Sequence, residues 1–355
     1  MKITNTIVLF LLLLVVSSCK NFLDPYPNND RSGEDIWNYQ ESVQGLIGEA
    51  YDNMSRNYNT NEGVYLDGAT DDAVITSPTH AMSRLAAGTI TTGQDPFLSY
   101  WDRNYQAIFM VNLFLKDDRG YNTRFLINDV NNNILRRRLK GEAFALRAWY
   151  QWDLLKKFGG KGVNGELLGF PIVKEPLDIA KKIDYPRNSY DDCVKSIIAD
   201  CDSAYKYLLI ANRDFLVKNS NELLFLGGRN WGRFDGITTV AIKADVYLTW
   251  ASPRFNPQNV MARWDSAAVN AKKVMDFKLN VDGGVTGGFK PNAAIDWSNP
   301  NSPEIVLSAR NIASDETIER MFYPGGFQGN GAQGRPFGLG APGPDHLDQW
   351  PLALP

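Results

Sequence analysis

Residues 141–160, GEAFALRAWYQWDLLKKFGG, decide the fold that we expect for this chain. Apolar side chains in and just before this stretch recur every three or four positions, which is the period of one face of an α-helix. They are Leu139, Ala143, Leu146, Tyr150 and Leu154. The pattern stops at the Phe158-Gly159 pair. We therefore predict a helix near Leu139–Phe158.

The same stretch predicts how this helix packs. Gly141, Ala145 and Ala148 repeat at helical spacing beside Trp149 and Trp152. Small residues in a row let a neighbouring helix approach closely, and large aromatic side chains fill the remaining space. Such packing between successive antiparallel helices is typical of tetratricopeptide-type arrays. No strict repeat period is visible, so we expect a degenerate array.

Helical periodicity extends over most of the chain. Four further apolar stripes predict helices: Ile36, Val43, Ile47, Ala50 and Met54; Trp101, Tyr105, Ile108, Asn112 and Leu115; Tyr190, Val194, Ile197, Cys201, Tyr205 and Leu208; and Trp264, Ala268, Ala271 and Met275. Another helix is predicted over Ile237–Ala251, ended by Pro253. Ser189 and Asp192 form a capping box. We expect long polar loops at Asn57–Leu98 and Asn280–Asn301, and a strand at Glu304–Ala309. The predicted fold is mainly α, with tetratricopeptide-like helix pairs, long loops and little β structure.

The first residues indicate export. Lys2 precedes an unbroken apolar stretch, Ile7–Val16. A helix of about ten residues is about 15 Å long, half the thickness of a bilayer core, so the stretch is a signal-peptide core and not a membrane span. Small residues lead directly to Cys19, which resembles a bacterial lipobox in which that thiol receives a diacylglyceryl group. We predict a signal peptide over 1–18 and a Pro/Asn/Asp-rich tether over 19–30, so acyl chains anchor the protein without crossing the membrane.

Cys193 and Cys201 are the cysteines left in the exported chain. They lie eight residues apart on one predicted helix, about 12 Å along its axis. A disulfide needs Cα atoms within about 7 Å, so we expect these cysteines to be small core residues that do not pair with each other.

Composition and motifs argue against several functional classes. The net charge of −3 and the scattered Lys and Arg give no nucleic-acid footprint, and we interpret the basic run Arg136–Lys140 as a solvated helix face. The chain has two histidines and carries no G-x-S-x-G, H-E-x-x-H or C-x-x-C motif. Residues 329–334 match G-x-G-x-x-G, but prolines flank them where a dinucleotide site needs a strand and a helix. We expect no cofactor, no metal and no enzymatic activity.

Six segments, in order, resemble the SusD/RagB family of Bacteroidetes outer-membrane nutrient-binding lipoproteins. The central one is similar to the family's G-E-A-x-F-L-R-A helix, which an F-G turn follows. The segments are Phe22–Pro25, Thr70–Ala73, Trp101–Leu115, Gly141–Ala148, Ile197–Ala204 and Ala241–Leu248. The resemblance implies a ligand-binding face made of loops. It also implies a SusC-like TonB-dependent β-barrel as the partner, over which the lipoprotein sits as a lid.

The resemblance also suggests how the chain is divided. We expect an N-terminal SusD-like helical region over 31–225 and the start of a C-terminal SusD/RagB region over 226–355. Family members usually continue well beyond an element that Pro342–Asp348 resembles, whereas this chain stops at Pro355. We therefore expect the C-terminal region to be incomplete. The expected location is the outer membrane, with a lipid anchor and an extracellular face.

Aromatic residues suggest where ligand binds. They make up 12% of the chain, with nine Trp. An aromatic ring offers a flat apolar surface on which a sugar ring stacks, while Asn, Asp and Arg hydrogen-bond to hydroxyls. We assign Trp101, Trp149, Trp152 and Trp264 to the core because they lie on helical stripes. The candidate ligand-binding residues are Trp231, Trp297, Phe322 and Tyr323 in loops, with Asp71 and Arg310 as polar partners, although plain loop packing explains these aromatics equally well.

Three functions stay open on these grounds. The first is capture of oligosaccharide for uptake, and the second is capture of peptide or another oligomer by the same architecture. The third is a helical scaffold that binds protein, for which a polar concave surface without loop aromatics is expected. A lipoprotein glycoside hydrolase would need two carboxylates about 5–10 Å apart in a cleft, a spacing that sequence does not give.

Overall fold

The computed structural model describes residues 34–54, 60–61, 64–71, 73–75, 78–177, 184–282, 305–307 and 352–353. The longer helices are α2 (Gln40–Asp52), α4 (Leu98–Leu115), α6 (Asp129–Phe158), α7 (Tyr190–Tyr207), α8 (Gly236–Ala251) and α9 (Met261–Phe277). The short helices are α3 (Ala81–Ala86), α5 (Arg119–Asn122) and the π-helical turn η8 (Lys278–Asp282). The 3-10 turns are η1 (Asp35–Asn38), η2 (Leu66–Ala69), η3 (Thr92–Gln94), η4 (Lys116–Asp118), η5 (Asp214–Leu216), η6 (Ser220–Leu224) and η7 (Gly227–Asn230).

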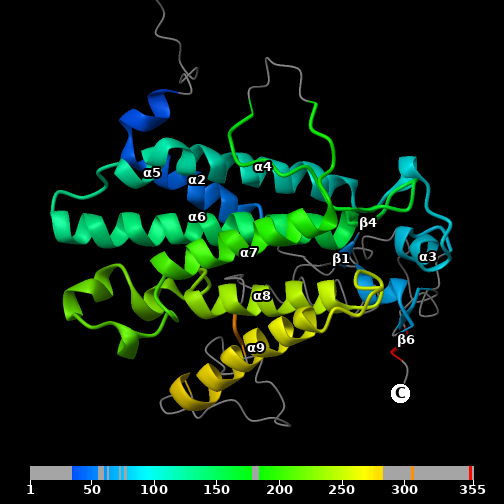
Figure 1. The fold of residues 1–355 in the computed structure, drawn as a ribbon. Coiled ribbons are helices and arrows are strands. Elements are labelled where there is room, and N and C mark those ends of the chain that lie inside the picture. The colour runs from blue at the N-terminus through cyan, green and yellow to red at the C-terminus, as the bar shows by residue number, and fades with distance from the viewer. Residues whose placement is uncertain are drawn as a thin grey trace, which may run out of the picture.

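The long helices lie side by side in chain order (Figure 1). α4 and α7 pack on α6, α2 packs on α4, α8 on α7 and α9 on α8. This arrangement confirms the mainly α fold with antiparallel helix pairs. The described strands form three two-stranded antiparallel pairs: β1 (Thr60–Asn61) with β2 (Val64–Tyr65), β3 (Ala73–Val74) with β6 (Leu352–Ala353), and β4 (Gly160–Lys161) with β5 (Leu167–Leu168).

Helix α6 is the centre of the core. Its residues Leu146, Leu154, Tyr150 and Trp152 are at most 2% exposed. A Cβ atom at Gly141 would lie 2.7 Å from Leu208 Cγ, so the predicted close approach of a neighbouring helix is present at this glycine. α6 is longer than predicted because Asn128 caps it, accepting a hydrogen bond from the backbone N–H of Asn131. The predicted stretch Leu139–Phe158 is the buried C-terminal two thirds of this helix.

The other helix predictions are confirmed with local corrections. Ser189 caps α7, accepting from the Asp192 N–H, and its hydroxyl donates to the Asp192 carboxylate at 2.7 Å. The predicted inward stripe of α7 includes Tyr205, but this side chain is 47% exposed. Ala204 is buried instead, because the buried face of α7 includes the predicted residues Val194, Ile197 and Cys201 but widens toward Asp200 and Ala204. The predicted loop 57–98 contains α3, which packs on η2 through Met82 and Leu66.

The predicted inward stripe of α9 is wrong. Ala268 and Met275 are exposed, and Ala267, Asn270 and Phe277 are buried instead. Trp264, assigned to the core, is partly exposed, whereas Trp152 is buried and Trp101 and Trp149 pack against the main core. Periodicity identified one apolar stripe of α9, but a second one contacts α8.

Two further expectations are corrected. Of the predicted strand Glu304–Ala309 the structure describes 305–307, and these residues form no strand. Val306 and Leu307 pack against helix side chains instead, so these apolar residues are covered without a partner strand. The basic run is also not a purely solvated face, since the Arg138 side chain is 11% exposed and Lys140 is buried.

No helix in the described part of the chain is both long enough and apolar enough to cross a bilayer.

Candidate functional site

A buried ion pair joins α6 and α7, which pack extensively on each other. Arg147 of α6 donates from Nε to Asp200 Oδ2 at 2.8 Å and from Nη2 to Asp200 Oδ1 at 2.7 Å. Both side chains are less than a tenth exposed. Two parallel charge-assisted hydrogen bonds fix the relative position and rotation of α6 and α7. Arg147 belongs to the GEAFALRA stretch, so the motif that predicts the helix also supplies its main polar contact.

Further polar groups complete this network. Gln151 Nε2 and Lys174 Nζ each donate to Asp200 Oδ2 at 2.6 Å. Arg147 Nη1 donates to the side-chain oxygen of Asn112 on α4 at 2.9 Å, and Asn112 Nδ2 donates to the Val173 carbonyl at 3.1 Å. The network therefore holds α4, α6, α7 and the connection after β5 in one arrangement. The sequence analysis does not predict this network. A signal for it is Arg147, an arginine next to predicted buried positions of an apolar helix.

The charges of this network shift the pKa of its acid. Burial raises the pKa of Asp200, but hydrogen bonds and positive charge from Arg147 and Lys174 outweigh burial and hold that pKa below its usual range. Asp200 is therefore ionised at neutral pH. An ionised carboxylate covered by cations is suited to holding helices and not to donating a proton.

Glu142 occupies a second buried charge cluster at the start of the same motif. Its side chain is fully buried, and its oxygens lie 3.2 Å from Arg138 Nε and 2.7 Å from Arg233 Nη1. Arg233 also lies over the Tyr51 ring, 5.0 Å from its centroid, and the Tyr51 hydroxyl accepts from the Phe234 N–H. This cluster fixes the segment before α8 against α6 and α2.

The other buried carboxylates that the structure describes have comparable partners. Asp153 binds Asn104 and Lys157, and Asp282 binds Arg213 and Lys278. Asp235 differs because it caps α8 through hydrogen bonds from Thr238, and burial raises the pKa of Asp235. No group of three His, Cys, Asp or Glu in the described ranges is placed to hold a metal ion.

Trp231 is the candidate ligand residue whose surroundings the structure describes best. It is partly exposed and follows η7 in a loop. Its neighbours are fixed: Asn230 is buried and accepts from Arg138 Nη1, Phe234 is buried, and Arg233 pairs with Glu142. The loop therefore presents this indole from anchored backbone.

Asp71 is exposed and lies just after η2. The segments that carry the two described candidates lie at opposite ends of the helical array: η5 to η7 beside the start of α8, and η2 beside α3 (Figure 1). The structure therefore does not bring Asp71 and Trp231 together. Cys19, Trp297, Arg310, Phe322 and Tyr323 lie outside the described residues. Cys193 and Cys201 are buried free thiols, as expected.

The helices built around this network match a known family. A family model described as starch-binding and associating with the outer membrane matches residues 21–217, more than half of the 355 residues. The chain belongs to the SusD/RagB family. The match runs from α2 through α7, so the Arg147–Asp200 pair lies within the matched residues, whereas Arg233 of the Glu142 cluster follows them.

Individual SusD-like proteins agree with this assignment. SusD-like protein P38 of Formosa agariphila is 24% identical over 342 residues, which cover 91% of this chain and 58% of that protein. A SusD homologue of Bacteroides thetaiotaomicron has a TM-score of 0.53 at 19% identity, covering 69% of this chain and 43% of that one. A SusD-like protein of Bacteroides fragilis has a TM-score of 0.52 at 17% identity, covering 70% and 40%. These structures share the fold, and the chain spans less than two thirds of each relative's length.

Proposed function

We propose that this protein binds glycan at the outer-membrane surface and delivers oligosaccharide to a SusC-like TonB-dependent transporter. The observation that carries the proposal is the match of residues 21–217 to a family described as starch-binding and associating with the outer membrane. The ligand is released intact, so the protein is a binding protein and not an enzyme. The buried carboxylates of Asp200 and Glu142 form ion pairs with Arg147 and Arg233 and so stabilise the fold, which supports a binding role and not a catalytic one.

The lipid on Cys19 holds the protein at the outer membrane. From Cys19 to Glu34, where the described structure begins, roughly 15 residues can span at most about 50 Å when extended. The folded domain therefore stays within reach of a barrel in the same membrane. Proteinase K added to intact cells tests the extracellular orientation. Digestion without cell lysis is expected, and protection until lysis would place the protein on the periplasmic side.

Ligand contact is assigned to loop aromatics. Trp231 is partly exposed on anchored backbone, which suits stacking on a sugar ring because a fixed ring loses little freedom on binding. Trp297, Phe322 and Tyr323 are proposed as further stacking residues, with Arg310 and Asp71 as hydrogen-bonding partners. Because the segment that carries Asp71 lies far from that of Trp231, Asp71 is assigned to a separate contact.

Replacement of Trp231 tests this assignment. Trp231→Ala is expected to weaken oligosaccharide binding by about 0.5–1.5 kcal/mol, the contribution of one aromatic stacking partner. Tyr205→Ala is the matched control, because Tyr205 is an exposed aromatic residue on α7 with no assigned role. Equal affinities of the two variants, with unchanged helical circular dichroism, would remove Trp231 from the site. Binding of peptides but not glycans would instead favour the peptide alternative.

A further inference from the structure

Helix α9 has two apolar faces, of which one packs inside the molecule. Ala267, Asn270 and Phe277 of this helix are buried, and α9 contacts α8 along its length. Phe277 joins a small core cluster with Ile237 and Val240 of α8. This face therefore already has its partner.

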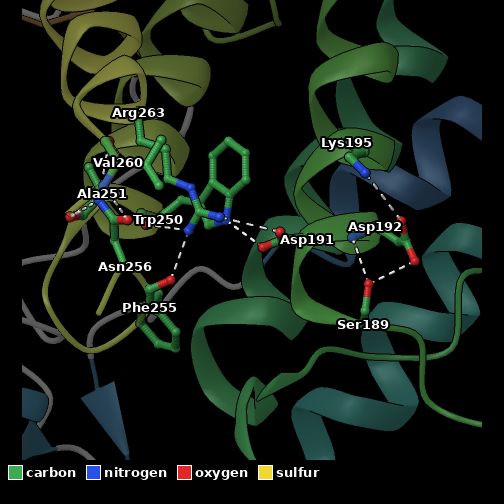
Figure 2. Close-up of polar contacts among 10 residues, drawn as sticks. All are labelled: Ser189, Asp191, Asp192, Lys195, Trp250, Ala251, Phe255, Asn256, Val260 and Arg263. Atoms are coloured by element: carbon green, nitrogen blue, oxygen red, sulfur yellow. Dashed lines mark hydrogen bonds and ion pairs between the residues drawn. The ribbon is translucent and has the colours of Figure 1, made fainter. Parts of the chain in front are cut away.

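The rotation of α9 about its axis is fixed by Arg263 (Figure 2). Its guanidinium carbon lies 3.9 Å from the centroid of the Trp250 ring, and Nη1 donates to the Phe255 carbonyl at 2.8 Å. Nη2 lies 3.3 Å from the carboxylate of Asp191 on α7, which also accepts from Trp250 Nε1 at 2.7 Å. Three helices meet at this contact, so the face that α9 turns outward is set by the fold.

That outward face is an apolar stripe. It consists of Met261, Trp264, Ala268, Ala271 and Met275, at successive spacings of three, four, three and four residues. Met261 and Met275 are 59% and 50% exposed, Ala268 is exposed, and Trp264 and Ala271 are partly exposed. Such spacing is the a/d pattern of a coiled-coil seam, and it extends about 21 Å along the helix.

The charges beside the stripe favour one orientation of a partner helix. Asp265 and Lys272 are the e positions of this heptad pattern and have opposite charge. In an antiparallel pair of identical helices e faces e, which creates two Asp265–Lys272 ion pairs by symmetry. In a parallel pair e would face g, where the uncharged residues Ala267 and Val274 offer no partner for either charge. The stripe is therefore self-complementary in the antiparallel orientation.

The apolar residues fit the same arrangement. Antiparallel pairing of a with d places Ala268 against Ala271 near the two-fold axis and Trp264 against Met275 on either side. Small residues at the centre let the two backbones approach closely, and the large residues fill the space beyond them. We propose that α9 forms an antiparallel, two-fold symmetric contact with α9 of a second copy of this chain.

Site-specific photo-crosslinking of the full lipoprotein in its own membrane tests the proposal. A photoreactive phenylalanine analogue replaces Met275, a large and exposed residue of the stripe, or in the matched control Val163, which is fully exposed in the β4–β5 turn. A covalent product of twice the chain's mass is expected from position 275 and not from position 163. Absence of that product, or a product with a different protein, would overturn the proposal.

Charge reversal identifies the geometry of the contact. Asp265→Lys is expected to lower the yield of dimer roughly fivefold, because both symmetric ion pairs become repulsive. The double variant D265K/K272D restores the opposite charges and is expected to restore the yield. Both residues are exposed, so Asp265→Lys is expected to leave the melting temperature unchanged. Lys272→Asp in the double variant loses the ion pair with Asp276 and is expected to lower the melting temperature slightly. A dimer yield that is the same in all three proteins would contradict the antiparallel contact.

Discussion

Arg147 and Asp200 form a two-point ion pair between α6 and α7, with the Nη2–Oδ1 distance at 2.7 Å and the side chains 7% and 5% exposed. Lys174 reaches the same carboxylate from the connection after β5. This pair stands at the junction of three helices, because Arg147 also donates to Asn112 of α4.

Removal of one partner is expected to be costly. Arg147→Met leaves Asp200 buried beside a single cation, so the free energy of unfolding is expected to fall by about 3–5 kcal/mol. The double variant R147M/D200L is expected to lose less than the sum of the two single variants, because no acid is then left uncompensated. Urea unfolding followed by circular dichroism measures these values. A loss below about 1 kcal/mol for Arg147→Met would show that the pair does not hold the helices.

The same pair predicts a pH dependence of stability. Because the pKa of Asp200 is lower in the folded than in the unfolded chain, its contribution is complete above the unfolded value of about 4. The contribution is lost as the pH falls through the folded pKa. Asp235, whose pKa is raised by burial, acts in the opposite sense, so the test compares wild type with Asp200→Asn. Their difference in urea midpoint is expected to shrink below about pH 4, and a constant difference would contradict the assignment.

Gly141 is expected to tolerate no side chain. A methyl group there would lie 2.7 Å from Leu208 Cγ, and overpacking of this kind costs about 1–3 kcal/mol, more than the gain of about 1 kcal/mol in helix propensity. Gly141→Ala is therefore expected to lower the melting temperature. Gly48→Ala in α2 is the control: a methyl group at Gly48 meets nothing within 4 Å, so this variant is expected to be stabilised by about 0.5–1 kcal/mol. Equal effects of the two substitutions would refute the close approach of α6 and α7.

Cys19→Ala is expected to abolish membrane anchoring, since the acyl chains supply the strong membrane affinity of the chain. Metabolic labelling with a palmitate analogue, followed by membrane fractionation, measures this. Label that persists in the variant would place the lipid on another residue.

The sequence predicted the long helices because most of them have a regular apolar stripe, and α7 also has a clear cap at Ser189. It failed on α9 because that helix has two apolar stripes, and periodicity does not show which one contacts α8. Trp264, Ala268, Ala271 and Met275 form a regular pattern, yet Arg263 turns them outward by binding Asp191. The side chain that decides the rotation is polar and lies outside the pattern.

Buried charge was the other feature that sequence reasoning missed. Arg138 and Lys140 belong to a basic run that suggests a solvated face. The pairing of Arg138 with Glu142 follows from their i,i+4 spacing, but the burial of this pair and the contact of Lys140 with Asp118 become visible only in three dimensions. The ligand-binding residues were even less predictable. A loop aromatic residue such as Trp231 has the same local sequence whether it packs against the protein or contacts a ligand. Its separation from Asp71 follows from the order of the helices.

Calorimetric titration of the full chain with starch-derived and other oligosaccharides tests the central claim most directly. Stacking and a few hydrogen bonds, offset by the entropy of association, predict saturable binding with a Kd between about 1 μM and 1 mM, and unchanged sugar after long incubation. Heat that does not saturate with any glycan of the panel, or the appearance of shortened oligosaccharides, would contradict the assignment of this protein as a glycan-binding lipoprotein.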